Sequence, residues 1–229
     1  MTRVPRSRTV RLAAYASAIA LTAAMGTGCG AQEATPSSST DQKATSPGEA
    51  RASEPAQRVL NTPLLEAALP NQFTVPTDFD QPRDRRAWDN YDTTICQSER
   101  WPDSWCAQAI AFGRAGFTNL EDQELSIRLI SFGDAATATR LFQGEGTPDE
   151  VGENPPGDQI DGFEIEAPDE LSWRGKGITV RQGAVVAKIE YTWEPGTAIP
   201  SDRLMSLADM VVQRIQQAQA GKPPTASAR

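Results

Sequence analysis

A strand hairpin followed by a long amphipathic helix, residues 177–219, constrains the fold more than any other stretch of this chain. Apolar and polar side chains alternate along residues 185–194, which is the pattern of a strand with one buried and one solvated face. Gln182-Gly183 precedes that run, and glycine readily takes the positive φ of a two-residue hairpin turn. A shorter alternation at Ile178 and Val180 predicts the first strand of the hairpin.

The helix after the hairpin is predicted to begin near Ser201, with Asp202 beside the positive end of the helix dipole. Gly221, followed closely by two prolines, ends it. One side carries an apolar stripe at helical spacing, which we expect to cover a sheet. The stripe consists of Leu204, Leu207, Ala208, Val211, Val212 and Ile215.

The earlier segments predict further strands and helices. Residues 107–117 and 123–132 predict a pair of strands, and a slip of phase in the second indicates a β-bulge or burial on both faces. Because the strands are neighbours in sequence, we expect one α+β domain over residues 58–220, with a mostly antiparallel curved sheet packed by helices and a closing C-terminal helix. The remaining expectations are helices at 64–68 and 135–142, short strands at 163–167 and 171–173, an exposed loop at 71–91 and a disordered tail at 221–229.

The first 57 residues predict an export signal and a tether. Residues 1–28 have a basic start without acidic residues, an alanine-rich apolar run and small residues before Cys29, as in a secretory signal peptide. The small residues ending in cysteine resemble the bacterial lipobox, although Gly26 stands where that motif prefers an aliphatic residue. The resemblance implies that Cys29 carries diacylglycerol and a further acyl chain such as palmitate; ordinary signal cleavage would leave Cys29 as an odd thiol. Residues 29–57 lack large apolar side chains and predict a disordered tether.

Composition excludes several classes of function. Removing residues 1–28 takes away four arginines and no acid, so the net charge falls from −8 to −12, which disfavours nucleic acid as a partner. The chain contains no histidine, which rules out Ser-His-Asp and Cys-His catalysis and most zinc sites. No nucleotide-binding motif is present, so we expect no cofactor. Carboxylates such as Asp169, Glu170 and Glu190 are better explained as solvated side chains than as a catalytic pair, and we expect no catalytic residue and no enzyme activity.

Cys96 and Cys106 are the most chemically specific pair in the folded region. Nine residues separate them, and in an exported protein such a pair predicts a disulfide rather than a metal site. Trp101 and Trp105 lie between them. Either these tryptophans pack locally against the disulfide or the closed loop presents them to a ligand. We keep Trp101 and Trp105 as candidate ligand-binding residues.

The acidic, Gly/Pro-rich segment 143–161 is predicted to be a solvated loop. A calcium site is the alternative, because hard cations take oxygen ligands, but the acidic residues follow no calcium-binding motif. We therefore expect no metal site.

Several motifs resemble actinobacterial secreted lipoproteins of the PknH-like extracellular sensor domain class. They are Cys29 with its lipobox-like context, Phe132-x-x-Ala135-x-x-Ala138, residues 180–186 and Leu207-Ala208-x-x-Val211. The resemblance implies a membrane-anchored module on the extracytoplasmic face that binds or senses an unidentified small molecule. The alternative is a structural or interaction lipoprotein that assists an envelope protein. In both cases the expected membrane contact is the N-terminal lipid anchor.

Overall fold

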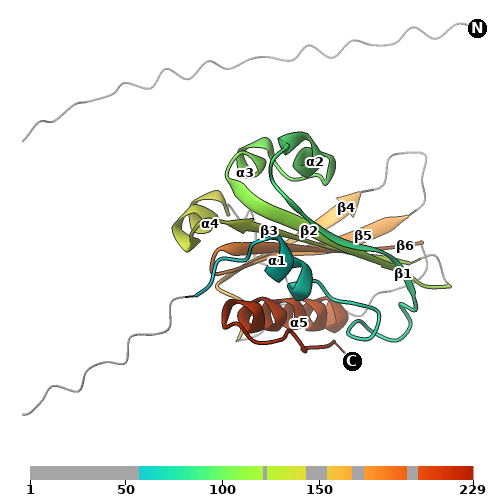
Figure 1. Cartoon of the computed structure of the whole chain (residues 1–229). Coiled ribbons are helices and arrows are strands. Elements are labelled where there is room, and N and C mark those ends of the chain that lie inside the picture. The colour runs from blue at the N-terminus through green and yellow to red at the C-terminus, as the bar shows by residue number, and fades with distance from the viewer. Residues whose placement is uncertain (1–56, 121–122, 143–153, 167–172, 195–200, 229) are drawn as a thin grey trace, which may run out of the picture. The chain divides into compact units, whose positions relative to one another are not determined.

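The computed structural model of this chain describes residues 57–120, 123–142, 154–166, 173–194 and 201–228 (Figure 1). Two compact units are distinguished, Met1–Arg51 and Ala52–Arg229, and the described residues all belong to the second. The predicted signal peptide, Cys29 and most of the tether lie outside the described residues. None of the described helices is both long and apolar enough to cross a bilayer.

The described residues form one six-stranded antiparallel sheet and five helices, which confirms the predicted α+β class with a closing C-terminal helix. The sheet has the strand order β1-β2-β3-β6-β5-β4. The strands are β1 Gln81–Asp89, β2 Ala109–Thr118, β3 Glu124–Phe132, β4 Gln159–Glu166, β5 Arg174–Gln182 and β6 Val185–Trp193. The helices are α1 Thr62–Ala68, α2 Thr93–Ser98, α3 Asp103–Cys106, α4 Ala135–Leu141 and α5 Ser201–Gln219.

One face of the sheet is covered by α1 and α5 (Figure 1). The apolar stripe of α5 packs there against the alternate apolar residues of β3, β5 and β6, so the stripe and the alternation meet in one core. Burial of a large aliphatic side chain contributes about 1.5–3 kcal/mol, which makes this layer the main source of stability. Its fully buried members include Leu125, Ile127, Leu129, Val185, Ile189, Leu207, Val211 and Ile215.

On the second face of the sheet, the buried apolar cluster lies at the end near the β5–β6 turn. There Phe112, Ile130, Phe132 and Val186 pack with the disulfide and with α4. The slip of phase in β3 therefore reflects burial on both faces, because the pairing of β3 with β6 is continuous. The other end of this face carries charged side chains.

One expectation about the region before the sheet was wrong. The predicted exposed loop at 71–91 contains β1, an edge strand on which only Ala87 is buried. Such a charged edge strand has no apolar alternation to detect, and charge at an edge also discourages pairing with other chains. Of the two short strands expected before the hairpin, the one at 163–167 corresponds to β4. The one at 171–173 falls mostly outside the described residues, and Trp173, its described member, precedes β5.

The segment after α5 differs from the expected disordered tail. Ala228 is buried, and its backbone N–H donates to the Thr74 carbonyl at 2.8 Å. The Gln217 side chain accepts the Thr225 N–H at 2.7 Å. Pro223 and Pro224 restrict the backbone before folding, so ordering this segment costs less entropy than the composition suggests.

Gly177 is required by the packing of Phe163 on the neighbouring strand. The two residues are partners across β4 and β5, and a Cβ on Gly177 would lie 2.1 Å from the Phe163 ring. The same ring also contacts the Lys188 ammonium, 4.7 Å from its centroid.

We expect Gly177→Ala to lower the free energy of unfolding by about 1–3 kcal/mol, because the ring must leave its position. Urea unfolding measures this change. Gly133→Ala is the control: a Cβ there meets nothing within 4 Å, and a change within about 0.5 kcal/mol is expected. Equal stability of the Gly177→Ala protein and the wild type would contradict this packing.

Candidate ligand-binding cleft

A cleft of ≈ 660 Å³ opens on the second face, at the end of the sheet away from the β5–β6 turn. Strands β2, β3 and β6 form its floor. Arg83 and Asp84 of β1 and the C-terminal end of α2 form one wall, and Trp173 and Glu194 lie on the opposite side.

The strand register explains why the cleft is charged. Arg114, Arg128 and Lys188 are direct partners across β2, β3 and β6, so three cationic side chains form a row on the same face. Like charges at opposite positions of antiparallel strands repel each other. The carboxylates of Asp84, Glu99 and Glu190 neutralise the row.

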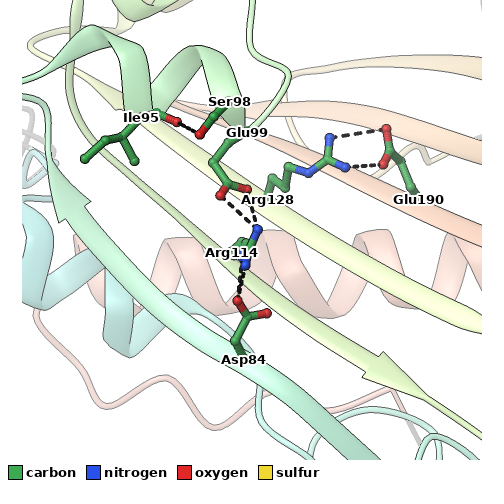
Figure 2. Close-up of polar contacts among 7 residues, drawn as sticks. All are labelled: Asp84, Ile95, Ser98, Glu99, Arg114, Arg128 and Glu190. Atoms are coloured by element: carbon green, nitrogen blue, oxygen red, sulfur yellow. Dashed lines mark hydrogen bonds and ion pairs between the residues drawn. The ribbon is translucent and has the colours of Figure 1, made fainter.

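Arg114 is held between two carboxylates from different elements (Figure 2). Its Nε donates to Asp84 Oδ2 at 2.7 Å, and its Nη1 donates to Glu99 Oε1 at 2.9 Å. Burial alone would lower the pKa of Arg114, but the hydrogen bonds and charges of Asp84 and Glu99 outweigh that effect and raise it. Arg114 therefore stays charged and ties both β1 and the end of α2 to the floor of the cleft.

Arg128 and Glu190 form the most buried ion pair of the floor (Figure 2). Arg128 Nη2 lies 2.6 Å from Glu190 Oε2, and the two side chains are 9% and 11% exposed. Lys188 Nζ adds a contact of 3.1 Å to the other carboxylate oxygen. The pair fixes both side chains in place beneath the opening.

A disulfide closes the segment that forms the α2 wall. Cys96 and Cys106 are bonded, as the sequence predicted, with their Cα atoms 5.7 Å apart. The closed loop contains Glu99 and Arg100, and Arg100 has a positive φ of 61°, which is uncommon outside glycine. The loop therefore projects Arg100 into the lining of the cleft while Glu99 turns to the floor.

Replacing both cysteines, Cys96→Ala with Cys106→Ala, is expected to lower the free energy of unfolding by about 3 kcal/mol, since the unfolded chain gains the entropy of an open loop. Urea unfolding of the full chain measures it. A reductant should bring the wild type to the stability of the double variant and leave that variant unchanged. A double variant as stable as the oxidised wild type would refute the prediction.

The structure places Trp101 and Trp105 in the second apolar cluster rather than in the lining of the cleft. Trp101 is 5% exposed and stacks on Trp105, whose ring meets the edge of Phe132. Their role in ligand binding stays a prediction. The tryptophans that line the cleft are Trp173 and Trp193.

The rim of the cleft carries separated charges that the sequence did not single out. Arg83 and Arg100 are exposed on the β1 and α2 side, and Glu124 and Glu194 are exposed on the β3 and β6 side. Within the described part of the chain, none of these four side chains forms an ion pair. Floor and rim together thus offer fixed donors and acceptors to a polar ligand.

The other sequence candidates are not brought together. Asp169 and Glu170 lie outside the described residues, and the carboxylate of Glu190 is engaged by Arg128 and Lys188. Most of the acidic segment 143–161 also lies outside them; within its described part, Asp158 pairs with Arg181 at 2.8 Å. In the part of the chain that the structure covers, no group of three or more acidic or cysteine side chains is placed to hold a metal ion.

Comparison with known proteins gives a weak structural likeness. The chain matches no protein-family model, and no curated protein matches it in sequence. Among solved structures it is similar to the extracellular domain of PknH from Mycobacterium tuberculosis, with a TM-score of 0.44 and 11% sequence identity. The match covers 72% of this chain and 100% of the PknH domain. Nothing about a ligand follows from a likeness at this level.

Proposed function

We propose that this protein is an extracytoplasmic lipoprotein that binds a small polar ligand in the cleft and acts as a binding or sensing module without catalysis. The observation that carries the proposal is the cleft itself, a concave site whose floor side chains are fixed by ion pairs, one of them buried. A floor of this kind loses little entropy when a ligand binds, and its unused donors and acceptors give orientation.

The predicted lipid on Cys29 would hold the module at the membrane surface, on the extracytoplasmic face. Two acyl chains anchor a protein stably where one does so marginally. Mass spectrometry of the N-terminal peptide tests this part, and Cys29→Ser should release the protein from the membrane fraction. Wild-type protein without a lipid would refute the anchor and leave the cleft untouched.

Thermal unfolding of the full chain in detergent, with panels of amino acids, short peptides and saccharides, tests ligand binding. A ligand at one hundred times its dissociation constant adds about 2.7 kcal/mol of stability, which raises the melting temperature by several degrees in a domain of this size. We expect such a rise for at least one polar class and not for apolar compounds.

Gly116→Leu fills the cleft without removing any charge, and a Cβ at Gly116 would make only ordinary contacts, 3.4 Å from Asp84 Oδ1 and 3.6 Å from Arg83 Cβ. It should abolish the ligand-induced rise while Gly133→Ala preserves it. Ser126→Tyr, also on the floor, serves if Gly116→Leu does not fold. A rise that persists in a folded cleft-filling variant, or no rise with any class, would overturn the proposal and favour the alternative of an interaction lipoprotein.

A further inference from the structure

The charges of the cleft are arranged in a definite direction across the sheet. Arg83 belongs to β1 and Arg100 follows α2 beside it, whereas Glu124 begins β3 and Glu194 follows β6. The sheet order β1-β2-β3-β6 puts the two kinds of charge on opposite sides. Between them the Arg114 and Arg128 cations are already neutralised by carboxylates, so the floor adds no strong field of its own.

This arrangement discriminates between classes of ligand. A simple anion would meet Arg83 and Arg100 but would also face Glu124 and Glu194. It could bind the floor arginines only by displacing the carboxylates paired with them, and the Arg128–Glu190 pair is largely buried. A neutral polyol would leave the rim charges on both sides uncompensated. A zwitterion with its charges far apart complements both sides at once, and electrostatic complementarity of this kind selects a partner and its orientation.

The spacing of the strands sets the length of that zwitterion. Neighbouring strands lie about 4.8 Å apart, so the distance from β1 to β3 or β6 is about 10–14 Å. An extended peptide rises about 3.3 Å per residue, and three or four residues therefore span the cleft. Trp173 lines the cleft on the acidic side, where an aromatic face also favours an ammonium group.

We infer that the cleft binds a short peptide with free termini, laid across the strands with its carboxylate at Arg83 and Arg100 and its ammonium at Glu124 and Glu194. This inference rests on the proposed function, since it names the ligand class of the same cleft. Because both termini of the peptide form charge pairs with the rim, the affinity depends on the length of the peptide and on whether each terminus is charged.

Isothermal titration of the full chain in detergent with dialanine, trialanine and tetraalanine tests the length. We expect trialanine and tetraalanine to bind and dialanine to bind more weakly, because two residues cannot reach both sides. N-acetylation or C-amidation of tetraalanine should each weaken binding about two- to fivefold, as expected for partly exposed charge pairs.

Paired rim variants assign each end of the peptide. In the Glu124→Gln/Glu194→Gln protein, N-acetylation should have no further effect, whereas C-amidation should still weaken binding. In the Arg83→Gln/Arg100→Gln protein the reverse should hold. These four side chains are exposed and take no part in the ion pairs of the floor, so both variants should keep the wild-type melting temperature.

The outcomes separate the inference from the proposed function. Binding of peptides regardless of length or capping, or binding of neutral saccharides alone with loss in Gly116→Leu, would overturn the peptide inference and leave the ligand-binding module standing. Capping effects that persist unchanged in both paired variants would also overturn it. An absence of binding by every compound class would remove both.

Discussion

Glu190→Ala should lower the free energy of unfolding by about 3–5 kcal/mol, a loss typical of removing one partner from a buried ion pair. The Arg128 side chain is only 9% exposed and would keep its charge without a carboxylate opposite it. Lys188, which also contacts Glu190, would lie beside Arg128 as an unscreened like charge, since the two are partners across β3 and β6. Urea unfolding of the full chain gives the change.

A double variant distinguishes loss of the pair from loss of packing. Arg128→Met with Glu190→Met replaces both charges by apolar side chains of similar length, and it should recover most of the stability lost in Glu190→Ala. Glu164→Ala, at an exposed position of β4, is the matched control and should change stability by about 0.5 kcal/mol or less. If Glu190→Ala changed the free energy of unfolding as little as Glu164→Ala, the Arg128–Glu190 pair would not be the rigid element of the cleft floor.

Arg214→Met is expected to cost a similar amount, about 3–5 kcal/mol, for a different reason. Arg214 is 2% exposed and lies on α5 without an acidic partner among the described residues. It donates hydrogen bonds of 2.9–3.1 Å to backbone carbonyls at the end of α1 and in the C-terminal segment: Ala67, Ala68, Leu69 and Ala226. Methionine would remove this donor from all four carbonyls, several of them orphaned by the end of the helix, and only Leu69 would keep another donor, the Arg85 side chain.

Burial, with a smaller effect of the Arg85 charge, lowers the pKa of Arg214 to about 10, so the group remains protonated at neutral pH. Arg214→Lys should recover only part of the stability, because an ammonium cannot reach four carbonyls in a planar fork. Arg203→Ala is the control on the same helix: its pair with Asp78 is partly exposed, and about 0–1 kcal/mol is expected. If Arg214→Met lowered the free energy of unfolding by no more than Arg203→Ala, water would be donating to these carbonyls in place of the guanidinium.

The elements that the sequence predicted well are those with a local pattern. The alternation of apolar and polar residues in β6 and the apolar stripe of α5 each repeat over many residues. Both arise because one side of the element is buried. β1 has no such pattern, since both of its faces are largely exposed. Helices α2 and α3 are too short for a periodic signal and are held by the disulfide.

The cleft could not be read from local pattern, because its residues come together only through strand register. Asp84, Glu99, Arg114, Arg128 and Glu190 are spread over more than one hundred residues of sequence, and each alone resembles a solvated charge. One signal was present: Arg114 and Arg128 interrupt strands that are otherwise mostly apolar. Pairing these strands would have placed the two arginines side by side.

The described part of the chain begins at Gln57, and two hydrogen bonds place this start relative to the cleft. The Arg58 N–H donates to the Gln219 carbonyl at the end of α5, and the Gln219 side chain donates to the Gln182 carbonyl beside the β5–β6 turn. The leading segment therefore joins the body at one extremity of the strands, while Glu194 and Trp173 mark the other. A probe or solid support attached at Gln57 would therefore lie at the end of the strands opposite to the cleft, away from the residues that line it.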